Sequence, residues 1–171
     1  EMGEGVIISL DPSSTALGAA LFTDAGRYIR SEVVKPDAPR AEHQERSHQI
    51  GRYLAELLGE EMASEDPIRI AIIEEPPSFM RAEFGNKNVQ HVAFGIVYHV
   101  VRLAKVPKIE IVNPATWTRG RHKEHRALHI RRRFQIPPEQ DRGNDACDAI
   151  GLAEWFIQRN PDKLIRERQA V

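Results

Sequence analysis

The chain has 171 residues, of which 41% are hydrophobic and 29% charged, and its formal net charge is −1. These values fit one globular domain, so we expect residues 1–171 to form it, with a charged tail at 160–171 that frays. No apolar run approaches the ~20 residues that span a bilayer, and the single Cys147 excludes an internal disulfide, so we expect a cytoplasmic protein.

Three segments near the N-terminus predict a meander of antiparallel strands. Residues 6–10 form an apolar run rich in β-branched side chains, which ends at Asp11-Pro12. Residues 16–22 and 28–34 follow, and short turns rich in Pro, Ser, Asp and Gly separate the three segments.

Helical and strand patterns alternate through the rest of the chain. We predict helices at 41–62, 88–104, 123–134 and 145–158, and strands at 68–73 and 109–112. Gly95 lies in the middle of the second helix, where it indicates close packing against another element. This order predicts an α/β fold with a mixed five-stranded sheet, in which three antiparallel strands are followed by two parallel ones and helices cover both faces.

Four carboxylates fall where this topology could bring them together. Asp11 and Glu74 each follow an apolar strand directly, and sites in such sheets lie at the carboxyl ends of strands. Asp145 and Asp148 are three residues apart at the start of the last helix, so they project from neighbouring positions on one face. Such a cluster requires cations to relieve its repulsion, and hard oxygen ligands suit Mg²⁺ or Mn²⁺. Two such ions, ~3.5–4 Å apart, can hydrolyse a phosphodiester through an activated water.

Each acid also has a purely structural interpretation. Asp11 can start a turn, and Asn144 has the chemistry of a helix cap, with acids in the first turn favouring the helix dipole. Glu75 is an alternative to Glu74 as the second ligand, because strand alternation places only one of the two inward. Glu74 is preferred because it follows the apolar run directly. The combination of acids, in this order, favours the metal site.

Positive charge is concentrated between residues 119 and 133. This stretch contains seven Arg and Lys residues and only one acid. A surface of this kind suits phosphate contacts, and a solvated helix face is the alternative. Histidines follow at helical spacing in the same stretch: His122, His125 and His129. Two histidines four residues apart can hold zinc, but no third ligand type lies nearby. A basic stripe that faces DNA is therefore the favoured interpretation.

Three segments together resemble a known family: Ile7-Ile8-Ser9-Leu10-Asp11-Pro12 with Gly18 after it, Ile72-Ile73-Glu74, and Asp145-Ala146-Cys147-Asp148-Ala149. Their order and spacing are similar to those of the RuvC family of Holliday junction resolvases, which belongs to the RNase H-like superfamily, over residues 6–157.

The resemblance implies roles for particular residues. The four acids, Asp11, Glu74, Asp145 and Asp148, would bind two Mg²⁺ or Mn²⁺ ions and carry catalysis together with Lys123. Phe79 would help to open the junction, and Arg119, Arg121, Lys123 and Arg126 would bind DNA. The helix at 88–104 would form the interface of a homodimer. Ser13 stands where the family commonly has glycine, and Trp117 lies near a position that is often basic, which shifts phosphate contacts to Arg119 and Arg121.

We therefore expect a structure-selective endodeoxyribonuclease that resolves Holliday junctions by two-metal-ion hydrolysis, as paired symmetric nicks made by a homodimer. Its partner would be branched DNA, with no membrane and no small-molecule cofactor. The resemblance also implies that it acts in the cytoplasm of a bacterial or phage-infected cell. Three alternatives remain: an RNase H-like nuclease for another branched or RNA substrate, a junction-binding protein without catalysis, and an ATPase of the actin type. The last needs a glycine-rich phosphate loop, for which the turn after Asp11 is a poor substitute.

Overall fold

A computed structural model describes residues 5–37, 42–77 and 87–161 of the chain. Its strands are β1 (Val6–Pro12), β2 (Leu17–Thr23), β3 (Tyr28–Val34), β4 (Ile68–Glu74) and β5 (Lys108–Val112). Its helices are α1 (His43–Met62), α2 (Lys87–Leu103), α3 (Pro114–Thr118), α4 (Lys123–Phe134) and α5 (Asp145–Arg159), with a 3-10 turn, η2, at Pro138–Gln140.

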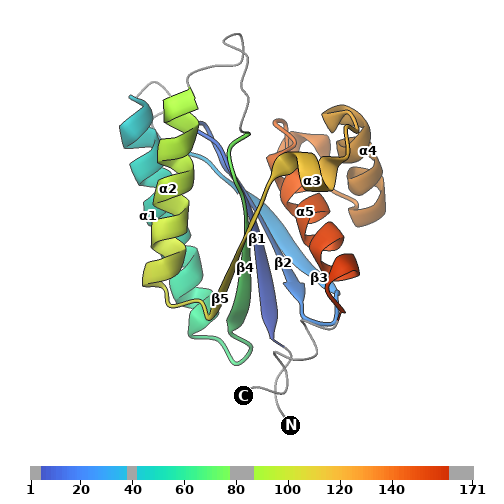
Figure 1. Ribbon diagram of the computed structural model, residues 1–171, viewed down its shortest axis with the longest axis horizontal. Helices are drawn as coiled ribbons and strands as arrows, with labels where there is room; N and C mark the ends of the chain where they lie inside the picture. The colour runs from blue at the N-terminus through green and yellow to red at the C-terminus, as the bar shows by residue number, and fades with distance from the viewer. Residues whose placement is uncertain (1–4, 38–41, 78–86, 162–171) are drawn as a thin grey trace.

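The strands form one sheet in the order β3-β2-β1-β4-β5. β2 pairs antiparallel with both β1 and β3, whereas β4 is parallel to β1 and β5 is parallel to β4. Figure 1 shows α1 and α2 on one face of this sheet and α4 and α5 on the other. The predicted fold class, a mixed five-stranded sheet covered on both faces, is confirmed.

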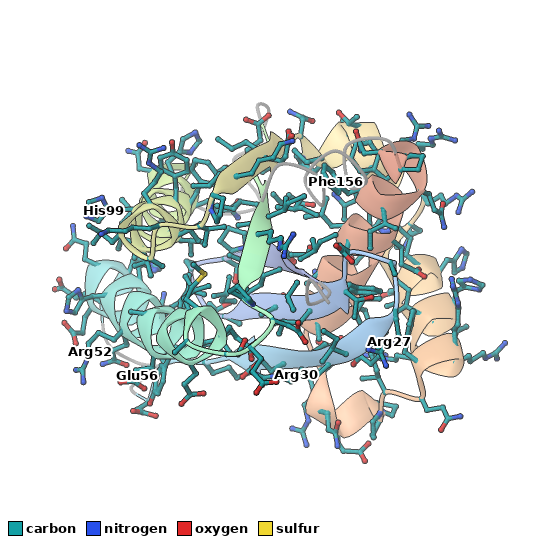
Figure 2. The ribbon with its side chains drawn as sticks, turned by 90° about the horizontal axis from the view of Figure 1, so that it is seen from below. Arg27, Arg30, Arg52, Glu56, His99 and Phe156 are labelled. Carbon is teal, nitrogen blue, oxygen red and sulfur yellow. The ribbon has the colours of Figure 1, made fainter. Side chains whose placement is uncertain are left out.

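The central strands β1, β2 and β4 are buried on both faces, which explains why they are nearly continuous apolar runs. In β1, Ile8 packs in one cluster with Leu58 of α1 and Val97 of α2. Its neighbour Ile7 points to the opposite face and packs in a second cluster with Phe156 of α5. Seen from below in Figure 2, Phe156 reaches inward from α5. Each such side chain stabilises the fold by about 1.5–3 kcal/mol relative to exposure.

Several details differ from the sequence-based expectations. The predicted helix at 41–62 begins at His43, and residue 41 lies outside the described residues. The short helix α3 was not predicted; it begins after Asn113, whose side chain accepts a hydrogen bond from the Ala115 amide at 2.9 Å. No described atom outside the surrounding helix turn lies within 4 Å of where a Gly95 Cβ would stand, so the close approach expected there is not made within the described chain.

The close approach between α1 and α2 occurs at another glycine. A Cβ at Gly51 would lie 2.6 Å from Cγ2 of Ile96, so Gly51 lets the two helices pack. Among the described residues, no helix is long and apolar enough to cross a bilayer.

Candidate active site

Asp11 and Glu74 lie at one edge of the sheet. Glu74 is the last residue of β4 and Asp11 the penultimate residue of β1, and these two strands are parallel neighbours. Their carboxyl ends therefore meet, as the sequence analysis predicted. In Figure 1 this is the edge at which α3 and α5 begin.

Gly18 brings the start of α5 to the same place. Gly18 is the β2 residue opposite Asp11, and a Cβ on it would stand 2.0 Å from the backbone oxygen of Asp145. Only a residue without a side chain allows this contact between strand and helix backbone. The close approach places Asp145, and one turn later Asp148, beside Asp11.

Two cations from α4 contact the acids of α5. The Lys123 ammonium lies 2.9 Å from Oδ2 of Asp148 and 3.9 Å from Oδ1 of Asp145. The Arg126 guanidinium donates a hydrogen bond to Oδ1 of Asp148 at 3.2 Å. Asp148 is buried in an apolar helix, and these partners compensate much of the cost of burying its charge.

Glu74, rather than Glu75, belongs to this group. The indole N–H of Trp117 donates a hydrogen bond to Oε2 of Glu74, and the Arg126 guanidinium lies 4.9 Å from the Trp117 ring centroid. Glu75 instead accepts a hydrogen bond from the Asn113 amide group at 2.8 Å. Trp117 therefore orients an acid of the site, a role that its sequence position did not indicate.

Burial and the charges of neighbouring acids raise the pKa values of Asp11, Glu74 and Asp145. Burial, followed by the charges of Glu74 and Asp148, raises the pKa of Asp11 well above its usual value. Burial also raises the pKa of Glu74, to about 7, although the hydrogen bond from Trp117 opposes the shift. Burial raises the pKa of Asp145 as well. These shifts indicate carboxylates crowded into a poorly solvated space, where a cation would be stabilising.

Burial acts to lower the pKa of the Lys123 ammonium, but the carboxylates of Asp148, Asp11 and Asp145 together raise it above its usual value. Lys123 thus remains charged among the acids and neutralises part of their repulsion.

The donor chemistry of the site fits a hard divalent cation. Asp11, Glu74, Asp145 and Asp148 offer carboxylate oxygens, the ligands that Mg²⁺ and Mn²⁺ prefer. The repulsion among these acids would be relieved by such an ion. Within the described ranges, however, no three His, Cys, Asp or Glu side chains are already grouped at spacings that would hold a metal. This includes His122, His125 and His129, so the zinc alternative gains no support.

Asp141 holds the start of α5, a role that the sequence analysis assigned to Asn144. Asn144 does occupy the N-cap position, but its side chain makes no capping hydrogen bond and its backbone is left-handed with φ of 62°. The Asp141 carboxylate accepts hydrogen bonds from the amides of Ala146 at 3.1 Å and Cys147 at 2.9 Å. Because Asp141 precedes the helix by four residues across a turn, the adjacent-cap pattern did not find it.

The predicted DNA-binding residues lie in two settings. Lys123 and Arg126 contact Asp148, whereas Arg119 and Arg121 are exposed and line a cavity beside Trp117. Phe79 lies outside the described residues, so its predicted role stays a prediction.

No family model matches the sequence, and no curated protein matches it. Solved structures do resemble it. Thermus thermophilus RuvC in complex with a Holliday junction substrate has 22% identity and a TM-score of 0.67, covering 91% of this chain and 96% of RuvC. A second T. thermophilus RuvC structure has 21% identity and a TM-score of 0.64, covering 90% and 96%.

The yeast mitochondrial Holliday junction resolvase is also similar in structure, at 10% identity and a TM-score of 0.54, covering 94% of this chain and 83% of the resolvase. The extent of these matches shows that the chain has the fold of RuvC, with the predicted strand order and helices on both faces.

Proposed function

We propose that this chain is a structure-selective endodeoxyribonuclease that resolves four-way DNA junctions with Mg²⁺ or Mn²⁺. The observation that carries the proposal is the convergence of Asp11, Glu74, Asp145 and Asp148 around Lys123, at the carboxyl ends of β1 and β4. The similarity to a RuvC solved with a Holliday junction substrate, over 91% of this chain, supports the choice of substrate.

Each residue of the site has a distinct task in this proposal. The four acids hold two divalent cations, which when bound supply a nucleophilic water and neutralise phosphate charge. Trp117 fixes the Glu74 carboxylate by its hydrogen bond, and Arg126 fixes Asp148. Lys123 keeps a positive charge beside the acids, where it would attract the scissile phosphate.

Cations outside the acidic cluster would hold the DNA backbone. Arg119 and Arg121 are exposed on the α3 side of the site, and neither has a carboxylate within 4 Å in the described part of the chain. Contacts from such residues to phosphates release counterions, so DNA binding should weaken steeply as salt is added.

The proposal includes a homodimer that forms through α2. Val92 is 39% exposed and Leu103 67% exposed on this helix. Exposed apolar side chains gain meaning where they accompany a larger apolar surface. A largely apolar groove of about 490 Å³ runs between α1 and α2, and Gly95 leaves open space above it. His99, which lines this groove, points away from the sheet in Figure 2. A second copy of α2 would bury these groups.

Analytical ultracentrifugation of a Gly95→Gln variant tests the dimer. A side chain at this position would keep two α2 helices apart, so the variant should sediment as a monomer. Gly59→Gln is the matched control, because Gly59 is also an exposed helical glycine with open space around it, on α1. A dimer that persists in the Gly95 variant, or a wild-type protein that is a monomer, would exclude this interface.

A cleavage assay tests the activity. Labelled four-way junction, flap, duplex and RNA–DNA substrates are incubated with Mg²⁺, Mn²⁺ or a chelator. We expect paired, symmetric nicks in the four-way junction that depend on either metal. Asp148→Asn should slow cleavage more than about 100-fold, since even residues behind a metal ligand cost 10–100-fold, while junction binding persists.

Three results would change the assignment. Cleavage of RNA without junction cleavage would indicate another RNase H-like nuclease. Junction binding without metal-dependent nicking would indicate a binding protein. Wild-type cleavage by Asp148→Asn would place the active site elsewhere.

A further inference from the structure

The cavity beside Trp117 has a volume of about 550 Å³ and lies between α3, α4 and α5. None of the four acids of the site lines it. It is joined to that site by two residues, because Arg126 and Trp117 line the cavity and also contact Asp148 and Glu74. Its volume is within the range of protein sites that enclose ligands. Its lining includes Trp155 and basic side chains of α4 and α5.

The cavity has an excess of positive charge. Glu154 is the one carboxylate among its described lining residues, and it forms an ion pair with Arg133 at 2.7 Å. Arg126 is engaged by Asp148. Three further lining arginines, Arg119, Arg121 and Arg159, have no carboxylate within ion-pair distance in the described residues. The ligand that suits such a cavity is an anion.

The cavity also presents flat aromatic and guanidinium groups. The Arg159 guanidinium lies 5.5 Å from the Trp155 ring centroid, and the rings of His122 and His125 have centroids 6.0 Å apart. The indole N–H of Trp155 is buried and has no hydrogen-bond partner among the described residues, so it is an unused donor. Nucleobases stack on surfaces of this kind and carry acceptors for such a donor.

The size of the cavity limits the length of its ligand. Its α5 wall runs from Gly151 to Arg159, which is about 12 Å at the rise of an α-helix. Neighbouring phosphates of one DNA strand are about 3.4 Å apart along a duplex axis, and farther apart in an extended strand, so about three nucleotides fit.

We propose that this cavity binds about three unpaired nucleotides of a DNA strand, with a base on Trp155 and phosphates on Arg121 and Arg159. The position of Arg126 makes these the nucleotides adjoining the scissile phosphate; this assignment to the cleaved strand rests on the proposed nuclease function. The cavity would thus capture bases that have unstacked at the centre of a junction.

Intrinsic fluorescence reads this cavity, because the chain has two tryptophans and both line it. Trp117 also contacts Glu74, so Trp155→Phe separates the signal of the cavity from a change at the acids. The probe is an oligothymidylate of eight nucleotides, titrated in chelator so that no cleavage occurs. We expect saturable quenching, and at least about fivefold weaker binding by Arg159→Ala and by Arg121→Ala, since each removes a phosphate contact. Trp155→Phe should lose most of the quenching.

Arg132→Ala is the matched control, because Arg132 is exposed on α4 but does not line the cavity. Absence of quenching, equal weakening by Arg132→Ala and Arg159→Ala, or equally strong quenching by a duplex of the same length would each overturn the proposal. The titration contains no metal and follows no reaction. Quenching by a protein that cleaves nothing would therefore support the cavity and refute the nuclease, and active protein without quenching would refute the cavity alone.

Discussion

Replacing Asp141 tests how the start of α5 is held beside the sheet. Asp141 is 1% exposed, and its carboxylate accepts hydrogen bonds from the amides of Ala146 and Cys147. Asp141→Ala leaves two buried donors without a partner, at about 1–3 kcal/mol each, so we expect the free energy of unfolding to fall by about 2–6 kcal/mol. Asp141→Asn keeps one acceptor oxygen, so it should lose about half as much.

Urea unfolding followed by circular dichroism measures these changes, with Asn144→Gly as the matched control. Asn144 makes no capping bond and has positive φ, which glycine adopts without strain, so its replacement should change stability by less than about 0.5 kcal/mol. A larger loss in Asn144→Gly than in Asp141→Ala would show that the cap is assigned to the wrong residue. Because α5 carries Asp145 and Asp148, Asp141→Ala should also slow any cleavage that these acids support.

Three further predictions concern the same region. Gly18→Ala should destabilise the protein by about 3 kcal/mol or more, since its Cβ would overlap the Asp145 backbone, whereas Gly59→Ala, in open space, should stabilise it by about 0.5–1 kcal/mol; similar effects in urea unfolding would contradict this. Glu74 has a folded pKa of about 7 against a usual 4.5, so the folded, metal-free protein binds more protons between these values and loses stability as pH rises through them, by up to about 3 kcal/mol. Glu74→Gln should flatten this slope, and an unchanged slope between pH 5 and 8 would refute its origin. Burial raises the pKa of Cys147 to about 12, so a thiol reagent at pH 8 should label it only after unfolding; rapid labelling of folded protein is the contrary result.

The sheet and the placement of the acids could be predicted because local sequence carries them. The strands before Asp11 and Glu74 are apolar runs, and burial on both faces requires such runs, so the acid after each run marks a strand end. The order of strands and helices then leaves few topologies, and parallel pairing of β1 with β4 brings the two ends together.

The parts that could not be predicted depend on tertiary contacts. Trp117 and Glu74 are 43 residues apart, and no local pattern indicates that an indole will bind this carboxylate. The ion pair from Lys123 to Asp148 likewise depends on how α4 packs against α5. The family resemblance indicated that Lys123 lies in the site, but only the fold shows that Asp148 is its partner.

Binding of Mn²⁺, followed by electron paramagnetic resonance without DNA, tests most directly whether the four acids form a metal site. Wild-type protein should bind the ion, and Asp11→Asn should weaken binding at least about tenfold, because it removes a half-buried carboxylate that interacts with the other three acids. Glu75→Gln should bind as wild type does, since Glu75 is engaged by Asn113. Undiminished binding by Asp11→Asn, or no binding by the wild type, would contradict the metal site on which the proposed chemistry depends.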